Sequence, residues 1–191
     1  MRRLTYFIAL SIDGFIAGPD DEVDFYPASD AYTAWMLEEY PDVLPVHGRA
    51  QLGLSDAPNR HFDTVLMGRR SYEPGLAAGL TSPFPHLRQY VVSTTQEDLD
   101  PAVTIVRDDP VSLVRRLKSE DSPLDVYLCG GGRLAATLLP EIDRMVVKRY
   151  PVVAGAGIQA FGGAPFAPTA FDLTDLKTFP GGNAVLVYDR V

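Results

Sequence analysis

The chain has 191 residues, of which 46% are hydrophobic and 22% charged, as expected of a globular protein with one well-buried domain. A formal net charge of −8 without any basic block argues against binding to nucleic acid or to an acidic membrane surface. The single cysteine, Cys129, excludes an internal disulfide, and no run reaches the ~20 apolar residues of a membrane helix.

These features predict a cytoplasmic protein. The three histidines (His47, His61 and His86) are scattered without the spacing of metal ligands, so no metal site is expected. No repeat, low-complexity tract or linker divides the chain, and residues 1–191 are predicted to form a single domain.

Predicted strands and helices alternate through the middle of the chain. The β-branched and aromatic content predicts strands at Arg3–Leu10, Thr64–Met67, Gln89–Ser93, Val103–Val106, Asp125–Cys129, Arg144–Tyr150, Phe171–Phe179 and Ala184–Tyr188. Helices are predicted at Ser29–Glu39, Arg70–Gly75, Pro110–Lys118 and Arg133–Leu139. This order predicts an α/β fold with a mostly parallel mixed sheet, helices on both faces and an antiparallel C-terminal edge. Pro41–Arg60 lacks a clear period and is predicted to be a long irregular connection.

The first segment of interest follows the first predicted strand. The chain turns at Asp13-Gly14 and reaches Gly18-Pro19-Asp20-Asp21, residue types that favour a flexible loop. This loop is interpreted either as a lid over a bound heterocycle or as a hairpin-like excursion with solvated acids.

The second segment places two arginines at the start of a helix. A strand ends at Gly68, and Arg69 and Arg70 follow at once. Cations at a helix N-terminus are unfavourable unless an anion binds there, and arginine suits phosphate. The pair therefore indicates a phosphate site, with solvated surface arginines as the alternative.

Two more strand ends carry groups that suit phosphate. Ser93, Thr94 and Thr95 follow one strand, where they either cap a turn or hold phosphate oxygens. Gly130-Gly131-Gly132 follows another strand and precedes Arg133, in the layout that brings a pyrophosphate to a helix N-terminus. A tight strand-to-helix turn is the alternative. Alanine at position 135 breaks the Gly-x-Gly-x-x-Gly fingerprint, so a standard Rossmann domain is disfavoured.

Together these segments resemble the dihydrofolate reductase-like superfamily, in particular stand-alone proteins similar to the reductase domain of the bifunctional riboflavin-biosynthesis deaminase-reductase. The matching pieces, in family order, are Ala9–Gly18, Val65–Glu73, Val126–Leu134 and Pro151–Phe161. The resemblance implies a central sheet of about eight strands. It further implies NADPH across the carboxyl edge of that sheet, and a homodimer.

The resemblance also implies which residues bind the cofactor. Ala9, Ile16 and Gly18 match positions that line the nicotinamide and its loop. Gly68, Arg69, Arg70 and Ser71, with Ser93 and Thr94, match the segment that holds the adenosine-side phosphates. Gly130, Gly131, Gly132, Arg133 and Leu134 match the pyrophosphate turn.

The resemblance identifies the catalytic residues less completely than the cofactor-binding residues. Asp30, near the start of the first predicted helix, matches the single acid of dihydrofolate reductases by loop length, although aspartate is favoured in any first turn. Asp13, in the Ser-x-Asp-Gly turn, is preferred over Asp30 for a substrate contact. The chain has no extra basic cluster for a ribose-phosphate tail and no zinc deaminase motif.

The leading hypothesis is an NADPH-dependent reductase that passes hydride to a small pyrimidine- or pterin-like heterocycle. One alternative is an NADP(H)-binding protein without turnover, such as a sensor or accessory subunit. The other is a true dihydrofolate reductase, disfavoured because Asp20–Ser29 lacks the Pro-Trp pair of that family.

Overall fold

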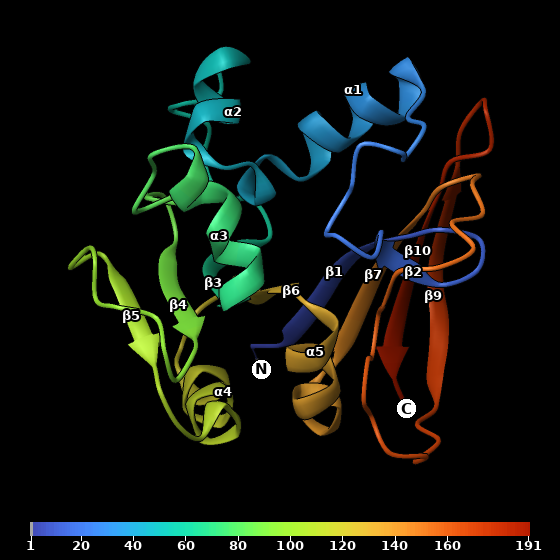
Figure 1. The fold of residues 1–191 in the computed structure, drawn as a ribbon. Helices are drawn as coiled ribbons and strands as arrows, with labels where there is room; N and C mark the ends of the chain where they lie inside the picture. The colour runs from blue at the N-terminus through green and yellow to red at the C-terminus, as the bar shows by residue number, and fades with distance from the viewer. Residues whose placement is uncertain (1) are drawn as a thin grey trace.

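The computed structural model describes residues 2–191 and is built around an eight-stranded sheet in the order β5-β4-β3-β6-β1-β7-β10-β9 (Figure 1). The strands are β1 (Leu4–Leu10), β3 (Phe62–Gly68), β4 (Arg88–Val92), β5 (Val103–Val106), β6 (Asp125–Gly130), β7 (Arg144–Arg149), β9 (Phe171–Thr178) and β10 (Ala184–Arg190). Neighbouring strands from β5 to β7 are parallel, whereas β10 is antiparallel to both β7 and β9. This confirms the predicted fold class.

Helices pack on both faces of the sheet. They are α1 (Asp30–Glu39), α2 (Val46–Gln51), α3 (Arg69–Ala77), α4 (Pro110–Ser119) and α5 (Gly132–Leu138), with short 3₁₀ turns η1 (Pro41–Val43) and η2 (Leu139–Glu141). None of the helices within residues 2–191 is long and apolar enough to cross a membrane.

The two faces carry different cores, because successive side chains of a strand point to opposite sides. On one face Phe7, Tyr40, Phe62 and Tyr127 form an aromatic core against which Trp35 of α1 packs. We call this the aromatic face. The other face is aliphatic, and it buries residues of α4 and α5 against Leu4, Ile8, Leu66 and Leu128.

The prediction of an irregular connection over Pro41–Arg60 is wrong in part, since η1 and α2 form there. Both elements are too short to show a helical period. Buried polar side chains hold them instead. Asp42 accepts hydrogen bonds from the N–H groups of His61 (2.6 Å) and Phe62 (2.9 Å), and Arg49 donates to the Pro41 carbonyl (2.8 Å).

A second, two-stranded sheet was not predicted. It pairs β2 (Phe15–Ala17) antiparallel to β8 (Ile158–Gln159), two segments far apart in the sequence. Neither is long enough to show alternation. The pairing joins the loop after β1 to the chain that follows β7.

Candidate functional site

Three of the strand ends selected from the sequence meet at one edge of the sheet. Strands β4, β3 and β6 are neighbours and parallel, so their carboxyl ends lie together. Met67 of β3 is in register with Gly130 of β6. A Cβ built on Gly68 would lie 3.5 Å from both the Gly130 carbonyl oxygen and the Gly131 nitrogen. The two glycine motifs are therefore in contact.

Helices α3 and α5 start at this edge, and neither has a capping side chain. Their N-cap residues are Gly68 and Gly131, and no acidic residue lies in either first turn. Gly130 adopts φ +112°, a region that favours glycine, and its peptide bond to Gly131 is cis. At Gly132 a Cβ would overlap the Gln159 carbonyl oxygen, whereas at Gly131 it would meet no atom within 4 Å. At the start of α5 there is thus open space beside Gly131 but none beside Gly132.

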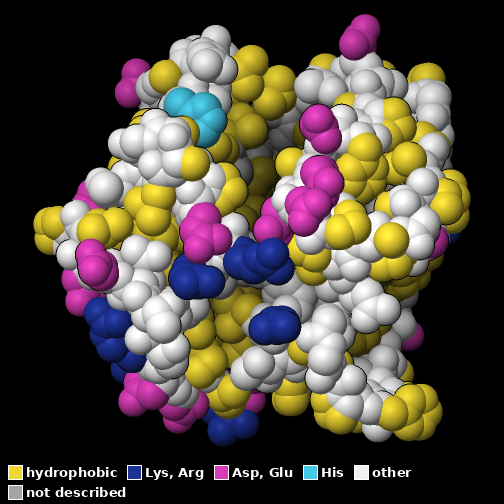
Figure 2. Space-filling model, viewed as in Figure 1, with side chains coloured by type: hydrophobic (Ala, Val, Ile, Leu, Met, Phe, Trp, Pro, Cys, Tyr) yellow, Lys and Arg dark blue, Asp and Glu magenta, His cyan; other side chains and the backbone are white. Residues whose placement is uncertain are grey.

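Three exposed arginines surround these helix starts. Figure 2 shows basic side chains gathered between α3 and α5, the helices that carry Arg69, Arg70 and Arg133. Arg70 forms an ion pair with Asp21 (2.8 Å), and Arg69 lies 3.4 Å from Glu73. Within residues 2–191 the Arg133 side chain has no hydrogen-bond or ion-pair partner. Positive charge and free N–H donors at one edge suit a polyphosphate.

The sequence predicts that the hydroxyls after β4 either cap a turn or hold phosphate oxygens. The Ser93 hydroxyl accepts hydrogen bonds from the N–H groups of Thr95 (3.2 Å) and Gln96 (3.0 Å), so it caps its own turn. Thr94 is exposed beside it. Ser71, in the first turn of α3, is close to the glycine turn, since a Cβ on Gly130 would lie 3.8 Å from the Ser71 hydroxyl oxygen.

Asp13 holds a loop in place. Its carboxylate accepts hydrogen bonds from the Ser11 hydroxyl (2.6 Å) and from the N–H groups of Ala154 (3.0 Å) and Gly155 (2.7 Å). The Ser11 bond first, and then the Ala154 bond, lower the pKa of Asp13 to about 2. The side chain therefore fastens the turn after β1 to the segment after β7.

Asp30 is the first residue of α1 and is exposed, and no hydrogen bond within residues 2–191 joins it to Asp13. The N-cap of α1 is Ser29, which accepts from the Tyr32 N–H. The two candidate acids lie on separate elements, Asp13 in the turn after β1 and Asp30 at the start of α1.

On the aromatic face a lysine lies among rings. The Lys148 ammonium is 4.4 Å from the centroid of the Phe7 ring. Burial lowers the pKa of Lys148 to about 8, and neighbouring Cys129 opposes part of that shift. Sequence reasoning did not select Lys148, although a lysine at an inward position of an apolar strand was a visible signal. Viewed as in Figure 1, the molecule is hollowed between α1 on one side and α2 and α3 on the other, with apolar side chains on the walls (Figure 2).

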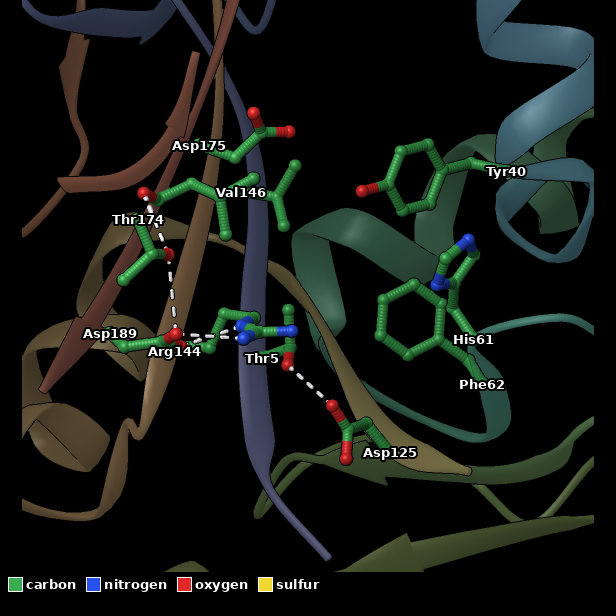
Figure 3. A pocket seen from close by; sticks show the side chains of 11 residues that line it. Thr5, Tyr40, His61, Phe62, Asp125, Arg144, Val146, Thr174, Asp175 and Asp189 are labelled. Carbon is green, nitrogen blue, oxygen red and sulfur yellow. Dashed lines mark hydrogen bonds and ion pairs between the residues drawn. The ribbon is translucent and has the colours of Figure 1, made fainter. Parts of the chain in front are cut away.

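A cavity of about 320 Å³ opens at the opposite end of the aromatic face (Figure 3). Its lining residues are Thr5, Tyr40, His61, Phe62, Asp125, Arg144, Val146, Thr174, Asp175, Val187 and Asp189. Arg144 donates two hydrogen bonds to Asp189, of 2.6 and 2.7 Å. This cavity lies at the amino ends of β1, β6 and β7, away from the glycine turn. Because its arginine is already paired, the candidate site is assigned to the carboxyl edge.

Comparison with known proteins points to one family. The family model described as "RibD C-terminal domain" matches residues 2–186. The uncharacterized protein YyaP of Bacillus subtilis (strain 168) is 27% identical over 200 residues, covering 98% of this chain and 94% of its own. YwjB of the same strain is 28% identical over 163 residues, covering 84% of this chain and 83% of its own.

Solved structures with low sequence identity share the fold. A putative riboflavin biosynthesis protein from Shewanella sp. PV-4 superposes with a TM-score of 0.69 at 20% identity, covering 99% of each chain. A diaminohydroxyphosphoribosylaminopyrimidine deaminase/5-amino-6-(5-phosphoribosylamino)uracil reductase from Thermotoga maritima gives a TM-score of 0.67 at 14% identity. That match covers all of this chain (100%) and 57% of the other.

Proposed function

This chain belongs to the RibD C-terminal domain family, and from that membership we propose that it is an NADPH-dependent reductase of a small planar heterocycle. The observation that carries the proposal is the pair of uncapped helix starts, in contact through Gly68 and Gly131 and surrounded by arginines. Such an edge offers N–H donors and positive charge to a pyrophosphate.

The residues at this edge fit a dinucleotide phosphate. Space is open at Gly131, where a side chain would intrude on a ligand. Gly130, Gly131, Gly132 and Arg133, with Leu134 behind them, would hold the pyrophosphate. Arg69 and Arg70, with Gly68, Ser71, Ser93 and Thr94, would hold the adenosine-side phosphates. When bound, NADPH supplies the hydride.

The loop after β1 would close the site. Ala9 at the end of β1, with Ile16 and Gly18 of the loop, would line the nicotinamide. Asp13 would position this loop through its three hydrogen bonds, and the Arg70–Asp21 ion pair would tie it to α3. The chain's own contribution to the reaction is then to orient the two reactants and to exclude water.

The substrate is proposed to be pyrimidine- or pterin-like, of the 5-amino-6-(5-phosphoribosylamino)uracil type that is named for the Thermotoga maritima relative. Asp13 remains the preferred acid for a substrate contact, ahead of Asp30. Retention of NADPH binding without NADPH oxidation across a panel of such heterocycles would favour a binding protein without turnover.

A fluorescence titration with NADPH, repeated with NADH, tests the proposal. We expect binding with a clear preference for NADPH, because the exposed Arg69 and Arg70 pair offers charged donors to a second phosphate. Absence of binding to either nucleotide would overturn the proposed function.

We also propose that the protein forms a homodimer through β9. This strand is an edge of the sheet, its residues 172–178 are exposed, and they include Leu173 and Leu176. Unpaired strand edges with apolar side chains favour pairing with another chain. Light scattering should give twice the monomer mass, and Leu173→Lys with Leu176→Lys should return the monomer.

A further inference from the structure

Lys148 differs from the other basic residue on the same side of its strand. Arg144, Val146 and Lys148 alternate along β7 and face the aromatic side of the sheet, as does Phe7 on the neighbouring strand. Arg144 is neutralised by a two-bond pair with Asp189. Within residues 2–191, Lys148 has no hydrogen bond or ion pair, and its ammonium contacts the Phe7 ring.

The register of the sheet places Lys148 beside the proposed cofactor site. On one side it is paired with Ala9, near the carboxyl end of β1, and on the other with Val185 of β10. Cys129, the residue before the glycine turn, packs on the same aromatic core. Lys148 is therefore at the carboxyl half of the aromatic face, and Arg144 is at the amino half.

A half-buried ammonium without an acceptor from the protein loses part of its hydration, and a ligand that supplies an acceptor offsets that cost. The Phe7 ring offsets part of that cost as a cation–π partner. Burial lowers the pKa of Lys148 only to about 8, so the side chain is mostly protonated at neutral pH. The aromatic face thus presents, at Lys148, a charged donor that has no acceptor among residues 2–191.

No carboxylate competes for this position among the residues described. The titratable groups of the aromatic core are Cys129 on β6 and the hydroxyls of Tyr32, Tyr40, Tyr72, Tyr127 and Tyr150. Burial raises the pKa of each of them, so all are neutral at pH 7. Strand β9 is separated from β7 by β10, and its charged side chains are Asp172, Asp175 and Lys177. Asp172 is in register with Asp189 of β10, and Asp175 lines the distant polar cavity with Asp125 and Asp189.

We propose that Lys148 is a substrate-binding residue that donates a hydrogen bond to a carbonyl oxygen of a planar heterocycle held against the aromatic face. This inference rests on the proposed function, and it narrows the substrate class. The amino groups of a ring are hydrogen-bond donors and pair with an acceptor such as a carboxylate. The Lys148 ammonium is itself a donor, so it pairs with an acceptor such as a ring carbonyl oxygen. With Lys148 as the donor, the aromatic face would therefore select dioxo rings over diamino rings of the same shape.

Lumazine and 2,4-diaminopteridine form a matched pair of probes, because they differ in carbonyl or amino groups at the same two ring positions. Their affinities would be measured by calorimetry with and without NADP⁺, at pH about 6.5, where an unperturbed or mildly shifted lysine is protonated. We expect lumazine to bind more tightly. Lys148→Met should weaken lumazine about tenfold to a hundredfold, the effect of losing a charged hydrogen bond, and should leave 2,4-diaminopteridine unchanged.

Lys177→Met is the matched control. Lys177 is also over aromatic rings, with its ammonium 4.9 Å from the Trp35 centroid, but it lies on the exposed edge strand β9. We expect this variant to bind lumazine like the wild type. The thermal unfolding midpoint of each variant shows that it is folded.

A titration of the Lys148 side-chain NMR signal, assigned with Lys148→Met, adds a readout independent of turnover. Its midpoint should be near the pKa of about 8 and should rise when lumazine binds, because a bound acceptor favours the charged form. An unchanged midpoint would count against the contact.

The outcomes separate this inference from the proposed function. If NADPH binds but Lys148→Met leaves lumazine affinity unchanged, the role of Lys148 is wrong and the reductase proposal stands. If Lys148→Met weakens lumazine binding as expected but the wild type does not bind NADPH, the reductase proposal fails and the role of Lys148 stands. A preference for 2,4-diaminopteridine, or no binding of either ring by the wild type, overturns the role of Lys148.

Discussion

Two pairs of helices in this protein begin in opposite ways. Helix α1 begins after Ser29, whose hydroxyl accepts from the Tyr32 N–H (3.3 Å), and α4 begins after Asp109, whose carboxylate accepts from the Ser112 N–H (3.0 Å). Helices α3 and α5 begin after glycines that cannot cap. The capped helices satisfy their own N–H groups, whereas the uncapped pair leaves them for water or a ligand.

The difference follows the position of each helix in the fold. The uncapped starts are in contact at the carboxyl edge of the sheet, and α3 carries Arg69 and Arg70 where a helix favours acidic residues. A capping side chain stabilises a helix start by ~0.5–2 kcal/mol relative to alanine and by roughly a few tenths of a kcal/mol relative to glycine. Helix α2, after Pro45, also lacks a capping side chain, but α3 and α5 lack one at the edge where an anion can bind, which would couple their stability to ligand binding.

The largest expected effect comes from the arginines of α3. Replacing Arg69 and Arg70 together with alanine should weaken NADPH far more than NADH, by roughly 1–3 kcal/mol per lost charged hydrogen bond. Fluorescence titrations with both nucleotides measure the difference. Arg116→Ala, an exposed arginine in the last turn of α4, is the control and should change neither affinity. Equal weakening of the two nucleotides would remove the assignment of a second phosphate site.

The next largest effects are expected at Gly131 and Gly132, two adjacent glycines at the start of the uncapped helix α5. At Gly131, alanine meets no atom within 4 Å, so the unfolding midpoint should be kept while NADPH affinity falls about tenfold, or ~1.4 kcal/mol. At Gly132, alanine overlaps the Gln159 carbonyl oxygen and should lower the free energy of unfolding by ~1–3 kcal/mol. Normal NADPH affinity in Gly131→Ala would contradict a pyrophosphate at this turn.

Removing the cap of α1 should have the opposite effect to Gly131→Ala, because it should lower stability and leave NADPH affinity unchanged. Ser29→Ala should lower the free energy of unfolding by ~0.5–2 kcal/mol and leave NADPH affinity unchanged, because α1 satisfies its own N–H group. Urea unfolding and the NADPH titration measure the two effects. The control is Ser112→Ala, which removes an exposed hydroxyl from α4 without removing a cap. A loss of NADPH affinity in Ser29→Ala would show that the two kinds of helix are not independent.

The smallest expected effect concerns Asp13. Its folded pKa of about 2 is below the ordinary value of 3.8, so its contribution to stability is present above pH 3.8 and is lost as the pH falls toward 2. Asp13→Asn should therefore be less stable than the wild type near neutral pH. The difference between their free energies of unfolding should shrink as the pH falls from 3.8 to about 2. Urea unfolding at a series of pH values tests this. The control is Asp20→Asn, at an exposed side chain of the same loop whose carboxylate accepts no hydrogen bond within residues 2–191, and it should unfold at the same urea concentration as the wild type near neutral pH.

The parallel strands and the glycine edge were predictable because their signals are local. Strands β1, β3 and β6 consist mostly of apolar and β-branched residues, and Gly68 and Gly130 stand at the ends of β3 and β6. Helix α2 was missed because a buried aspartate and a buried arginine, rather than a periodic apolar stripe, hold that region. Strands β2 and β8 were missed because each exists only through pairing with the other.

The sequence by itself determined the eight strands of the main sheet, the helices α1, α3, α4 and α5, the family resemblance and the glycines that end β3 and β6, since each depends on residues that are close together along the chain. Only the tertiary structure decided that Asp13 binds a loop from the far end of the chain, and that Lys148 lies unpaired over Phe7 while Arg144 is paired with Asp189. Pairing, burial and charge compensation depend on which strands become neighbours, and sheet order is set by long-range contacts that no local pattern contains.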